Sequence, residues 1–286
     1  MWLKAVTGIA LVLATCLGAA IAYGSYRWNV GTRELRARLD AARMSVQPAT
    51  FDSHEIDPLP APVQRYFRAV LKPGQPMIAA ASIAHTGTFN MSDTAEQWKA
   101  FSSTQHVVIQ RPGFDWDGRI ALLPGMDVHV HDAYVNGEGI LHAALLGLIT
   151  LADVRGTPAM AQGELMRFLA EAAWYPTTLL PSQGVKWAAV DDSSAKATFH
   201  DGATTVSLLF RFDAEGQIST VRAESRGRMS NGALVTAPWQ GRFWNYEVRD
   251  GMRIPIEGEV EWELPEGRRP YWRGRLTRAE FVFVNR

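Results

Sequence analysis

The sequence predicts an α+β fold: a mainly antiparallel, curved sheet, open or half-barrel, covered by a few helices and preceded by an N-terminal membrane helix. Three observations support this prediction. Residues 5–26 form an uncharged, largely apolar run. Residues 163–181 carry the clearest helical pattern and lie between two strand-rich halves. After them, turn signals that end in glycine recur between runs long enough to be strands, which is typical of an antiparallel meander.

These patterns divide the 286 residues into a transmembrane anchor at 1–30, a helical stalk and linker at 31–58, and a single β-rich globular domain at 59–286. The formal net charge is zero, so no basic field indicates a nucleic-acid partner. The single cysteine, Cys16, lies in the apolar run, which excludes a disulfide from the domain. No phosphate loop, dinucleotide fingerprint or catalytic-serine motif occurs, so we expect no cofactor.

The 22 residues of the apolar run are enough to cross a bilayer as a helix, and we expect an uncleaved anchor that holds the protein on a membrane. The main alternative is a cleaved signal peptide, which needs only about 7–15 apolar residues. Residues 13–16 also loosely resemble a lipoprotein cleavage box. Five arginines follow the run, which by the positive-inside rule favours a cytoplasmic domain. The fold favours the periplasm, so we expect a single-pass protein of the inner (cytoplasmic) membrane with a periplasmic domain, its orientation left open.

The segments up to residue 123 alternate between helical and strand patterns. Residues 32–44 are charged and helical in pattern, and we expect them to continue the anchor as a stalk. Residues 63–71 form a short amphipathic helix that Pro73 and Gly74 end. Strand patterns then follow at 82–91, 96–110 and 114–123.

Residues 126–141 alternate two valines with His129 and His131, which places both imidazoles on one face of a strand. A zinc site can use such a pair, but no third ligand follows at a recognisable spacing. We therefore expect a polar outer face and no metal. Residues 142–152 are almost wholly apolar and too short to span a bilayer, so they predict a buried core helix or, as the alternative, a lid.

The stretch at 163–181 contains the central helix, which has an apolar stripe with the i, i+3, i+4 spacing. Tyr175-Pro176 ends this helix. We expect Phe168, Leu169 and Trp174 to be buried against the sheet. Another face carries the charged residues Glu164, Arg167 and Glu171. Their spacing predicts exposed charge pairs of Arg167 with either glutamate, each worth about 0.2–0.5 kcal/mol.

The later turn signals are Asp201-Gly202, Glu215-Gly216, Asn231-Gly232, Asp250-Gly251 and Glu266-Gly267. Between the last two, apolar and charged residues alternate, so one face of this strand is wet and the other is buried or lines a cavity. A three-residue loop at 249–251 pairs Trp244 with Ile256, and a five-residue loop at 265–269 pairs Trp262 with Trp272. We therefore expect Trp244, Trp262 and Trp272 to form one aromatic patch that faces the central helix.

Four stretches carry a resemblance to a known family: RYFRAVL at 65–71, DAYVNGEG at 132–139, residues 163–181, and PYWRGRL at 270–276. Together they resemble an uncharacterised family of bacterial membrane-anchored proteins, which implies no activity. Tyr246, Gly251, Ile254 and Pro255 more distantly resemble a strand pair of the periplasmic lipoprotein carriers (LolA/LolB-like). This second resemblance implies an unclosed, curved sheet with helices on its concave face and binding of acyl chains.

The sequence favours a membrane-anchored binding or carrier module for a hydrophobic, lipid-like ligand in the cell envelope. The residues expected to bind this ligand are Trp174, Trp187, Trp244, Tyr246, Trp262, Trp272, Arg167 and Glu171. An envelope enzyme that uses Glu164, Arg167 and Glu171 is one alternative, and a non-catalytic scaffold of an envelope complex is another. No catalytic residue is assigned, since a solvated helix face explains the three charges as well. The oligomeric state is left open.

Overall fold

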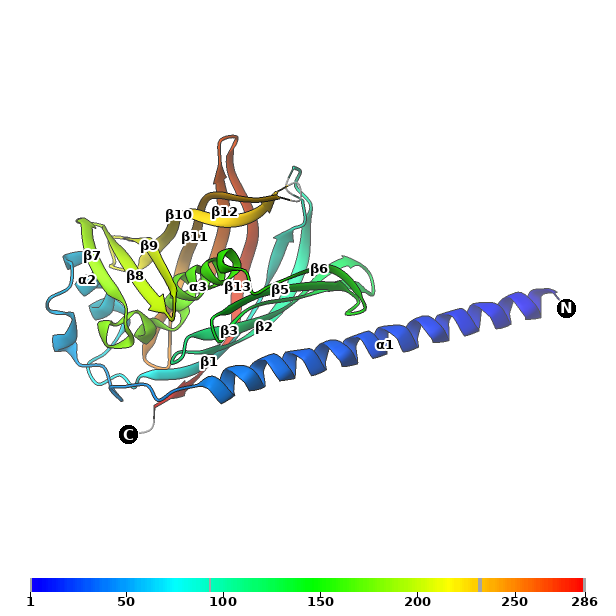
Figure 1. Cartoon of the computed structure of the whole chain (residues 1–286), viewed down its shortest axis with the longest axis horizontal. Coiled ribbons are helices and arrows are strands. Elements are labelled where there is room, and N and C mark those ends of the chain that lie inside the picture. Colours follow the sequence, from blue (N-terminus) through cyan, green and yellow to red (C-terminus); the bar gives the residue numbers. More distant parts are fainter. Residues whose placement is uncertain (1, 93, 231–232, 285–286) are drawn as a thin grey trace.

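The computed structural model describes residues 2–92, 94–230 and 233–284. Within them, three α-helices accompany one sheet of thirteen strands (Figure 1). The helices are α1 (Trp2–Ala42), α2 (Ala61–Val70) and α3 (Pro158–Glu171), with short 3-10 turns at Ser53–Ile56, Ala172–Trp174, Pro176–Leu179 and Pro181–Gln183. The strands are β1 (Ile78–Asn90), β2 (Trp98–Val108), β3 (Gly113–Leu123), β4 (Met126–Val135), β5 (Glu138–Leu145), β6 (Ile149–Arg155), β7 (Lys186–Asp191), β8 (Ser194–Asp201), β9 (Thr204–Phe212), β10 (Ile218–Ser230), β11 (Ala233–Arg249), β12 (Met252–Leu264) and β13 (Gly267–Phe283).

The sheet is antiparallel throughout and open, with the order β6-β5-β4-β3-β2-β1-β13-β12-β11-β10-β9-β8-β7. Its strong curvature is evident from the contacts of α3, which packs against β3, β4 and β5 in one half of the sheet and against β9 and β10 in the other. Figure 1 shows α3 held inside this curve. The predicted fold class, an open antiparallel sheet covered by a few helices, is confirmed.

The glycine turns of the second half are confirmed where the structure describes them. Asp250 and Gly251 both have positive φ (47° and 83°), as a two-residue hairpin turn requires, and Gly202 and Gly216 also have positive φ. The Asn231-Gly232 turn lies outside the described residues. The predicted helix at 63–71 is also present as α2, with Tyr66 and Phe67 buried.

The prediction of a helix or lid at 142–152 is wrong. These residues form the end of β5, a turn at Leu146–Leu148 and most of β6. The pattern misled because both faces of β5 are covered: Leu141 lines a cavity under the concave face, and His142 stacks on Trp28 of α1 on the other face. A strand covered on both faces reads as a continuous apolar run, as a buried helix does.

The central helix also differs from its predicted bounds. It begins at Pro158, where the hydroxyl of Thr157 accepts a hydrogen bond from the backbone N–H of Met160 (3.2 Å), and it ends at Glu171. Residues 172–183 follow as 3-10 turns rather than as a continuous helix. Phe168, Leu169 and Trp174 are buried, as predicted.

The predicted register of the last three strands is wrong in detail. The β11–β12 turn has two residues, so Trp244 lies opposite Glu257, not opposite Ile256. The β12–β13 turn also has two residues, and a bulge at Tyr271 follows, so Trp272 lies opposite Val260. The ladder of opposite charges on the outer face persists with a shift of two residues. Its pairs are Arg273 with Glu259 (2.7 Å) and Arg275 with Glu257.

Helix α1 is the one helix of the described residues that is long and apolar enough to cross a membrane. It does not end with the apolar run but continues to Ala42, and its second half lies on the convex face against β2, β3 and β4 (Figure 1). The residues predicted to form a stalk therefore pack on the sheet, where Leu39 is buried.

The contact between α1 and the sheet is largely polar. Trp28 donates from Nε1 to Asp117 (2.8 Å) and stacks on His131 (4.3 Å between ring centroids). His131 pairs in turn with the buried Asp115 (2.8 Å), to which Arg36 also donates (3.0 Å). The histidines of the His-x-His pattern thus lie on the outer face, as predicted, but beneath α1 rather than in solvent. Burial and the nearby Arg119 lower the pKa of His129 to about 4.

Candidate functional site: two joined cavities under the sheet

Two cavities lie between the concave face of the sheet and α3. The inner cavity, of about 250 Å³, is lined by side chains of β3, β4, β11, β12, β13 and α3. The outer cavity, of about 880 Å³, reaches the surface between the β1–β2 loop, the β12–β13 turn and the start of α3. They share the lining residues Phe89, Asp132, Leu141, Arg226 and Tyr271, so they adjoin.

Aromatic side chains from distant strands form most of the walls. In the inner cavity these are Trp116, Trp174, Trp239, Phe243 and Trp272. In the outer cavity Trp262 stacks on Tyr271 (6.0 Å between ring centroids). The bulge in β13 turns both Tyr271 and Trp272 toward the cavities. Behind the wall, His85 packs against Trp174 and Trp272, and burial lowers its pKa to about 3, so it is neutral.

Arg167 of α3 is the centre of a polar cluster in the wall of the inner cavity. Its guanidinium donates to Asp132 of β4 (2.6 Å) and to Glu171 one helical turn later (2.7 Å). Gln105 of β2 donates to the other oxygen of Glu171 (2.7 Å). The guanidinium also lies over the rings of Phe114 and Trp116, about 5 Å from each centroid.

The predicted pairing of Arg167 with Glu171 is confirmed, but the predicted solvated helix face is wrong. The side chains of Arg167 and Glu171 are each 14% exposed, and Glu164 is 3% exposed as a residue. The helix is enclosed by the curved sheet on this side as well, which is why its charges are buried. Their i, i+3 and i+4 spacing is identical in both situations, so the spacing alone could not tell them apart.

A second arginine, Arg226 of β10, completes the cluster where the two cavities meet. It lies 3.4 Å from Glu164 and packs over the ring of Trp239. Among the described residues, the second oxygen of Glu164 and one oxygen of Asp132 are buried without a hydrogen-bond donor. Two carboxyl groups in this position can pair only if one carries a proton.

The surroundings favour a protonated Glu164. Burial raises the pKa of Glu164 well above its usual value of 4.5, and the neighbouring Asp132 raises it further through charge repulsion and a hydrogen bond. Arg226 and Arg167 act in the opposite direction. With Glu164 neutral, the two arginines are balanced by Asp132 and Glu171. The cluster then carries no net charge and contains one acidic proton at the junction of the cavities.

Replacing Glu164 by glutamine is expected to stabilise the protein increasingly as the pH rises. Wild-type stability falls above about pH 4.5 because the unfolded chain releases the Glu164 proton while the folded state retains it. Glutamine does not titrate, so the difference should grow by up to about 1.4 kcal/mol per pH unit until the folded-state pKa is reached. Denaturant unfolding of both proteins at about pH 5 and about pH 8 measures this. A difference that does not change with pH would show that Glu164 is ionised in the fold.

Five of the eight residues predicted to bind the ligand line the cavities. Arg167, Glu171, Trp174 and Trp272 line the inner cavity, and Trp262 lines the outer one. These five come from α3 and the turn after it, and from β12 and β13.

The structure places the other three predicted residues elsewhere. Trp244 is 40% exposed and donates to Glu257 on the outer face, so it does not join the predicted aromatic patch with Trp262 and Trp272. Trp187 packs against Phe210 and donates to the carbonyl of Leu179. Tyr246 donates to the carbonyl of Ile218. Both are half-buried and support the end of the sheet near α2, away from the cavities.

Sequence reasoning missed Asp132, Arg226 and the wall residue Phe89. A signal existed for Asp132, because it follows Val128 and Val130 at the period of two and so falls on the apolar face of its strand. No comparable signal marks Arg226, which lies among several charged residues of β10.

Comparison with known proteins shows the family. The model of a family of unknown function (DUF6920) matches residues 57–281, so the chain belongs to that family, and the expected membership of an uncharacterised family is confirmed. No curated protein matches.

Two solved structures are similar at low identity. One, a LolA superfamily protein from Nitrosomonas europaea, is 10% identical with a TM-score of 0.32, over 78% of this chain and 93% of that one. The other, a beta-barrel-like protein of the domain of unknown function DUF1849 from Brucella abortus, is 11% identical with a TM-score of 0.20, over 72% of this chain and 99% of that one.

Proposed function

We propose that this member of the family binds a hydrophobic, lipid-like ligand in the two joined cavities, while α1 anchors the domain to a membrane of the cell envelope. The observation that carries the proposal is the outer cavity of about 880 Å³, which opens to the surface and continues inward between aromatic walls. Ligand pockets have volumes of about 300–1,000 Å³ and are mostly apolar with a few polar groups.

The walls suit a chain of methylene groups. Each methylene that leaves water for an apolar site gains about 0.8 kcal/mol, so ten of them gain about 8 kcal/mol before the cost of ordering the chain. The cluster of Asp132, Glu164 and Arg226 lies where the cavities meet and would contact a polar group on that chain. Because the cluster is already balanced in charge, an uncharged group such as an ester fits it better than a free anion.

The location is part of the same proposal: the inner membrane, with the domain in the periplasm. Arginines after the apolar run favour the opposite orientation, but two of them serve the fold. Arg36 pairs with Asp115, and Arg38 pairs with Glu138. These ion pairs give the two arginines a structural role on the convex face of the sheet.

Two glycines in the cavity walls can each accept a Cβ with only ordinary contacts, so larger side chains there would extend into the cavities. Gly163 in α3 lines the outer cavity, and a Cβ there would meet Arg226 at 3.5 Å, an ordinary contact. Gly241 in β11 lines the inner cavity, and a Cβ there would also make only ordinary contacts. Leucine at 163 additionally improves helix propensity by about 1 kcal/mol.

The test is native mass spectrometry of the full chain purified in mild detergent. We expect wild type to retain a lipid adduct and the double variant Gly163→Leu, Gly241→Leu to lose most of it while remaining folded. The matched control is Gly31→Leu, a helical glycine of α1 with open space around it, which should retain the adduct. Equal adducts on all three proteins would contradict binding in the cavities.

An enzyme that acts on such a ligand is a second candidate, favoured by one observation. Glu164, with its raised pKa, lies at the junction of the cavities close to Asp132, as a general acid would. Turnover of an uncharged ester by wild type, lost in Glu164→Gln although the lipid adduct is kept, would support this candidate. Absence of turnover by wild type would leave binding alone.

A further inference from the structure

The tip of the β5–β6 hairpin is packed against α1 within the apolar run. A Cβ on Gly24 would lie 2.1 Å from the carbonyl oxygen of Leu146 and 2.8 Å from the side chain of Leu148. On the other side of the contact, a Cβ on Gly147 would lie 2.7 Å from the carbonyl oxygen of Gly24. Glycine at both positions permits this close approach, so the hairpin tip is fixed at the level of residue 24 of the helix.

This level coincides with one end of the expected membrane span. The apolar run of residues 5–26 extends about 33 Å as a helix, close to the hydrocarbon thickness of a bilayer. Gly24 is two residues from its end, and Arg27 is the first charge that follows. Tyr23 and Tyr26 are exposed on the helix at this height, where aromatic side chains prefer the membrane interface.

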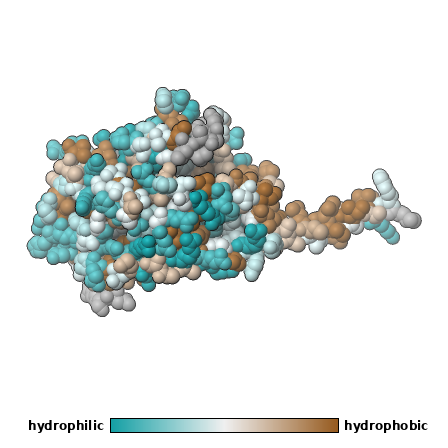
Figure 2. Space-filling view, in the orientation of Figure 1, coloured by the Kyte–Doolittle hydropathy of each residue, from teal (hydrophilic) through white to brown (hydrophobic). Residues whose placement is uncertain are grey.

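Large apolar side chains are exposed around the hairpin tip. Ile149 is 61% exposed, Leu151 is 56% exposed, and Leu123 in the neighbouring β3–β4 hairpin is 60% exposed. The two hairpins lie side by side, because the N–H of Leu146 donates to the carbonyl of Asp127 (2.8 Å). Figure 2 shows hydrophobic surface on the domain where the helix leaves it.

The mouth of the outer cavity lies at the strand ends on the same side of the sheet as the tip of the β5–β6 hairpin. Because all strands are antiparallel, the β1–β2, β3–β4, β5–β6 and β12–β13 connections lie at strand ends along one rim of the sheet. Helix α1 crosses the sheet from His106, near the opposite rim of strand ends, to Leu146 at this rim. The exposed lining residues Thr94 and Glu96 belong to the first of these connections, and Arg269 lies at the start of β13, just after the last. The cavity mouth and the tip of the β5–β6 hairpin therefore lie along the same rim of the sheet.

We propose that the β3–β4 and β5–β6 hairpins of this rim dock on the bilayer that α1 enters, with Leu123, Ile149 and Leu151 in the interface and the cavity mouth farther along the same rim. The inference rests on the proposed anchoring by α1. It identifies the bilayer itself as the surface with which the cavity would exchange its ligand. A second copy of the chain is the competing occupant, since β6 is an edge strand with one unpaired side.

The test uses the full chain with Cys16→Ser in vesicles of brominated phosphatidylcholine. Single cysteines replace Leu123, Ile149 or Leu151 and carry an environment-sensitive fluorophore. Val12, within the apolar run, reports the anchor, and Val190, 55% exposed on the opposite edge strand β7, is the matched control. We expect bromolipid to quench the probes at 12, 123, 149 and 151 at least twofold more than the probe at 190.

Each other outcome overturns the inference in a recognisable way. Quenching at 12 with only control-level quenching at 123, 149 and 151 would refute the docking while leaving the anchor in place. Protection of these three probes from aqueous iodide without quenching by bromolipid would assign the surface to a second copy or another protein. A probe at 12 that bromolipid does not quench would refute the anchor, and the docking with it.

Discussion

Replacing Arg167 by alanine is expected to lower the free energy of unfolding by about 3–5 kcal/mol. The change leaves Asp132 and Glu171 without the guanidinium that pairs with both, in a site where the arginine and Glu171 are only 14% exposed. It also removes the packing of the guanidinium over Phe114 and Trp116. Denaturant unfolding of the full chain in detergent, followed by tryptophan fluorescence, measures the loss.

Arg249→Ala is the matched control for this prediction. Arg249 pairs with Glu247 at 2.6 Å, but both side chains are nearly half exposed, so the loss should be under about 1 kcal/mol. A similarly small loss for Arg167→Ala would mean that water reaches the cluster freely. The cluster would then be an exposed helix face, as the spacing of its charges suggested.

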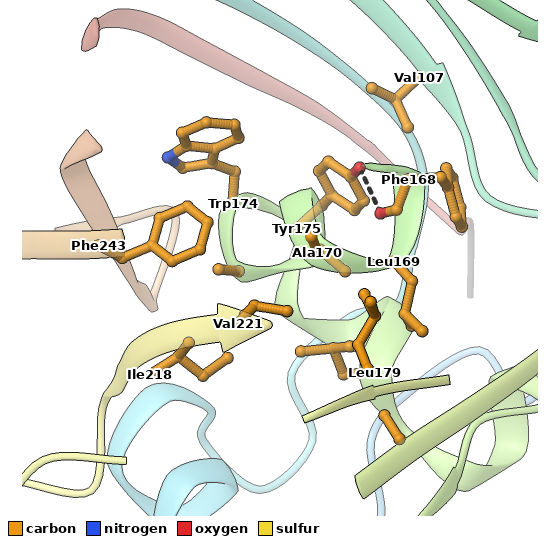
Figure 3. Close-up of a cluster of buried hydrophobic side chains, with 14 of the residues drawn as sticks. Val107, Phe168, Leu169, Ala170, Trp174, Tyr175, Leu179, Ile218, Val221 and Phe243 are labelled. Atoms are coloured by element: carbon orange, nitrogen blue, oxygen red, sulfur yellow. Dashed lines mark hydrogen bonds between the residues drawn. The ribbon is translucent and has the colours of Figure 1, made fainter. Parts of the chain in front are cut away.

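Truncating Phe168 to alanine is expected to cost about 3–5 kcal/mol, because it leaves a cavity at the centre of the core. Phe168 is fully buried and packs against Phe199 and Tyr175, with ring centroids 5.9 and 5.8 Å away. Its carbonyl also accepts a hydrogen bond from the Tyr175 hydroxyl, drawn as a dashed line in Figure 3. Phe168 thus joins α3 to the turn that follows it.

The control for Phe168→Ala is Val248→Ala, at a position that is 55% exposed on β11. A surface change of this kind should alter stability by no more than about 0.5 kcal/mol. Thermal unfolding of both variants beside wild type separates the two cases. A loss below about 1 kcal/mol for Phe168→Ala would contradict a close-packed core around α3.

The fold class could be predicted because several short sequence patterns along the chain indicate it independently. Glycine turns and period-two alternation predicted hairpins, and a helix flanked by strand-rich halves predicted that one helix lies under the sheet. Residues 142–152 show where local signals end. In β5, Leu141 faces a cavity and His142 faces α1, and only tertiary contacts reveal that this strand is covered on two faces.

The register could not be predicted from the rule that apolar partners face each other. Val248 lies opposite Arg253 in the structure, a pairing that the rule rejects, because Val248 is exposed on the outer face. The left-handed conformations of Asp250 and Gly251 fix the turn instead. The bulge at Tyr271 inserts one residue into β13 and turns two aromatic rings inward, and no residue pattern announces it.

The candidate site depended most on long-range geometry. Glu164 and Arg226 are 62 residues apart, and Asp132 lies on a third element, β4. Curvature of the sheet around α3 brings these elements together, and curvature is not encoded in the period of any single strand. The five predicted residues that line the cavities lie on α3, the turn after it, and strands β12 and β13, where the aromatic pattern was densest.

Photo-crosslinking can show whether the joined cavities hold a lipid-like ligand. The full chain in vesicles is irradiated with a diazirine-bearing monoacylglycerol, an uncharged ester, and the modified residues are mapped by peptide mass spectrometry. We expect modification of Phe89, Leu141 and Tyr271, which line both cavities, and its loss in the double variant Gly163→Leu, Gly241→Leu. Modification confined to α1 and the exposed tips at Leu123 and Ile149, unchanged in that variant, would contradict it.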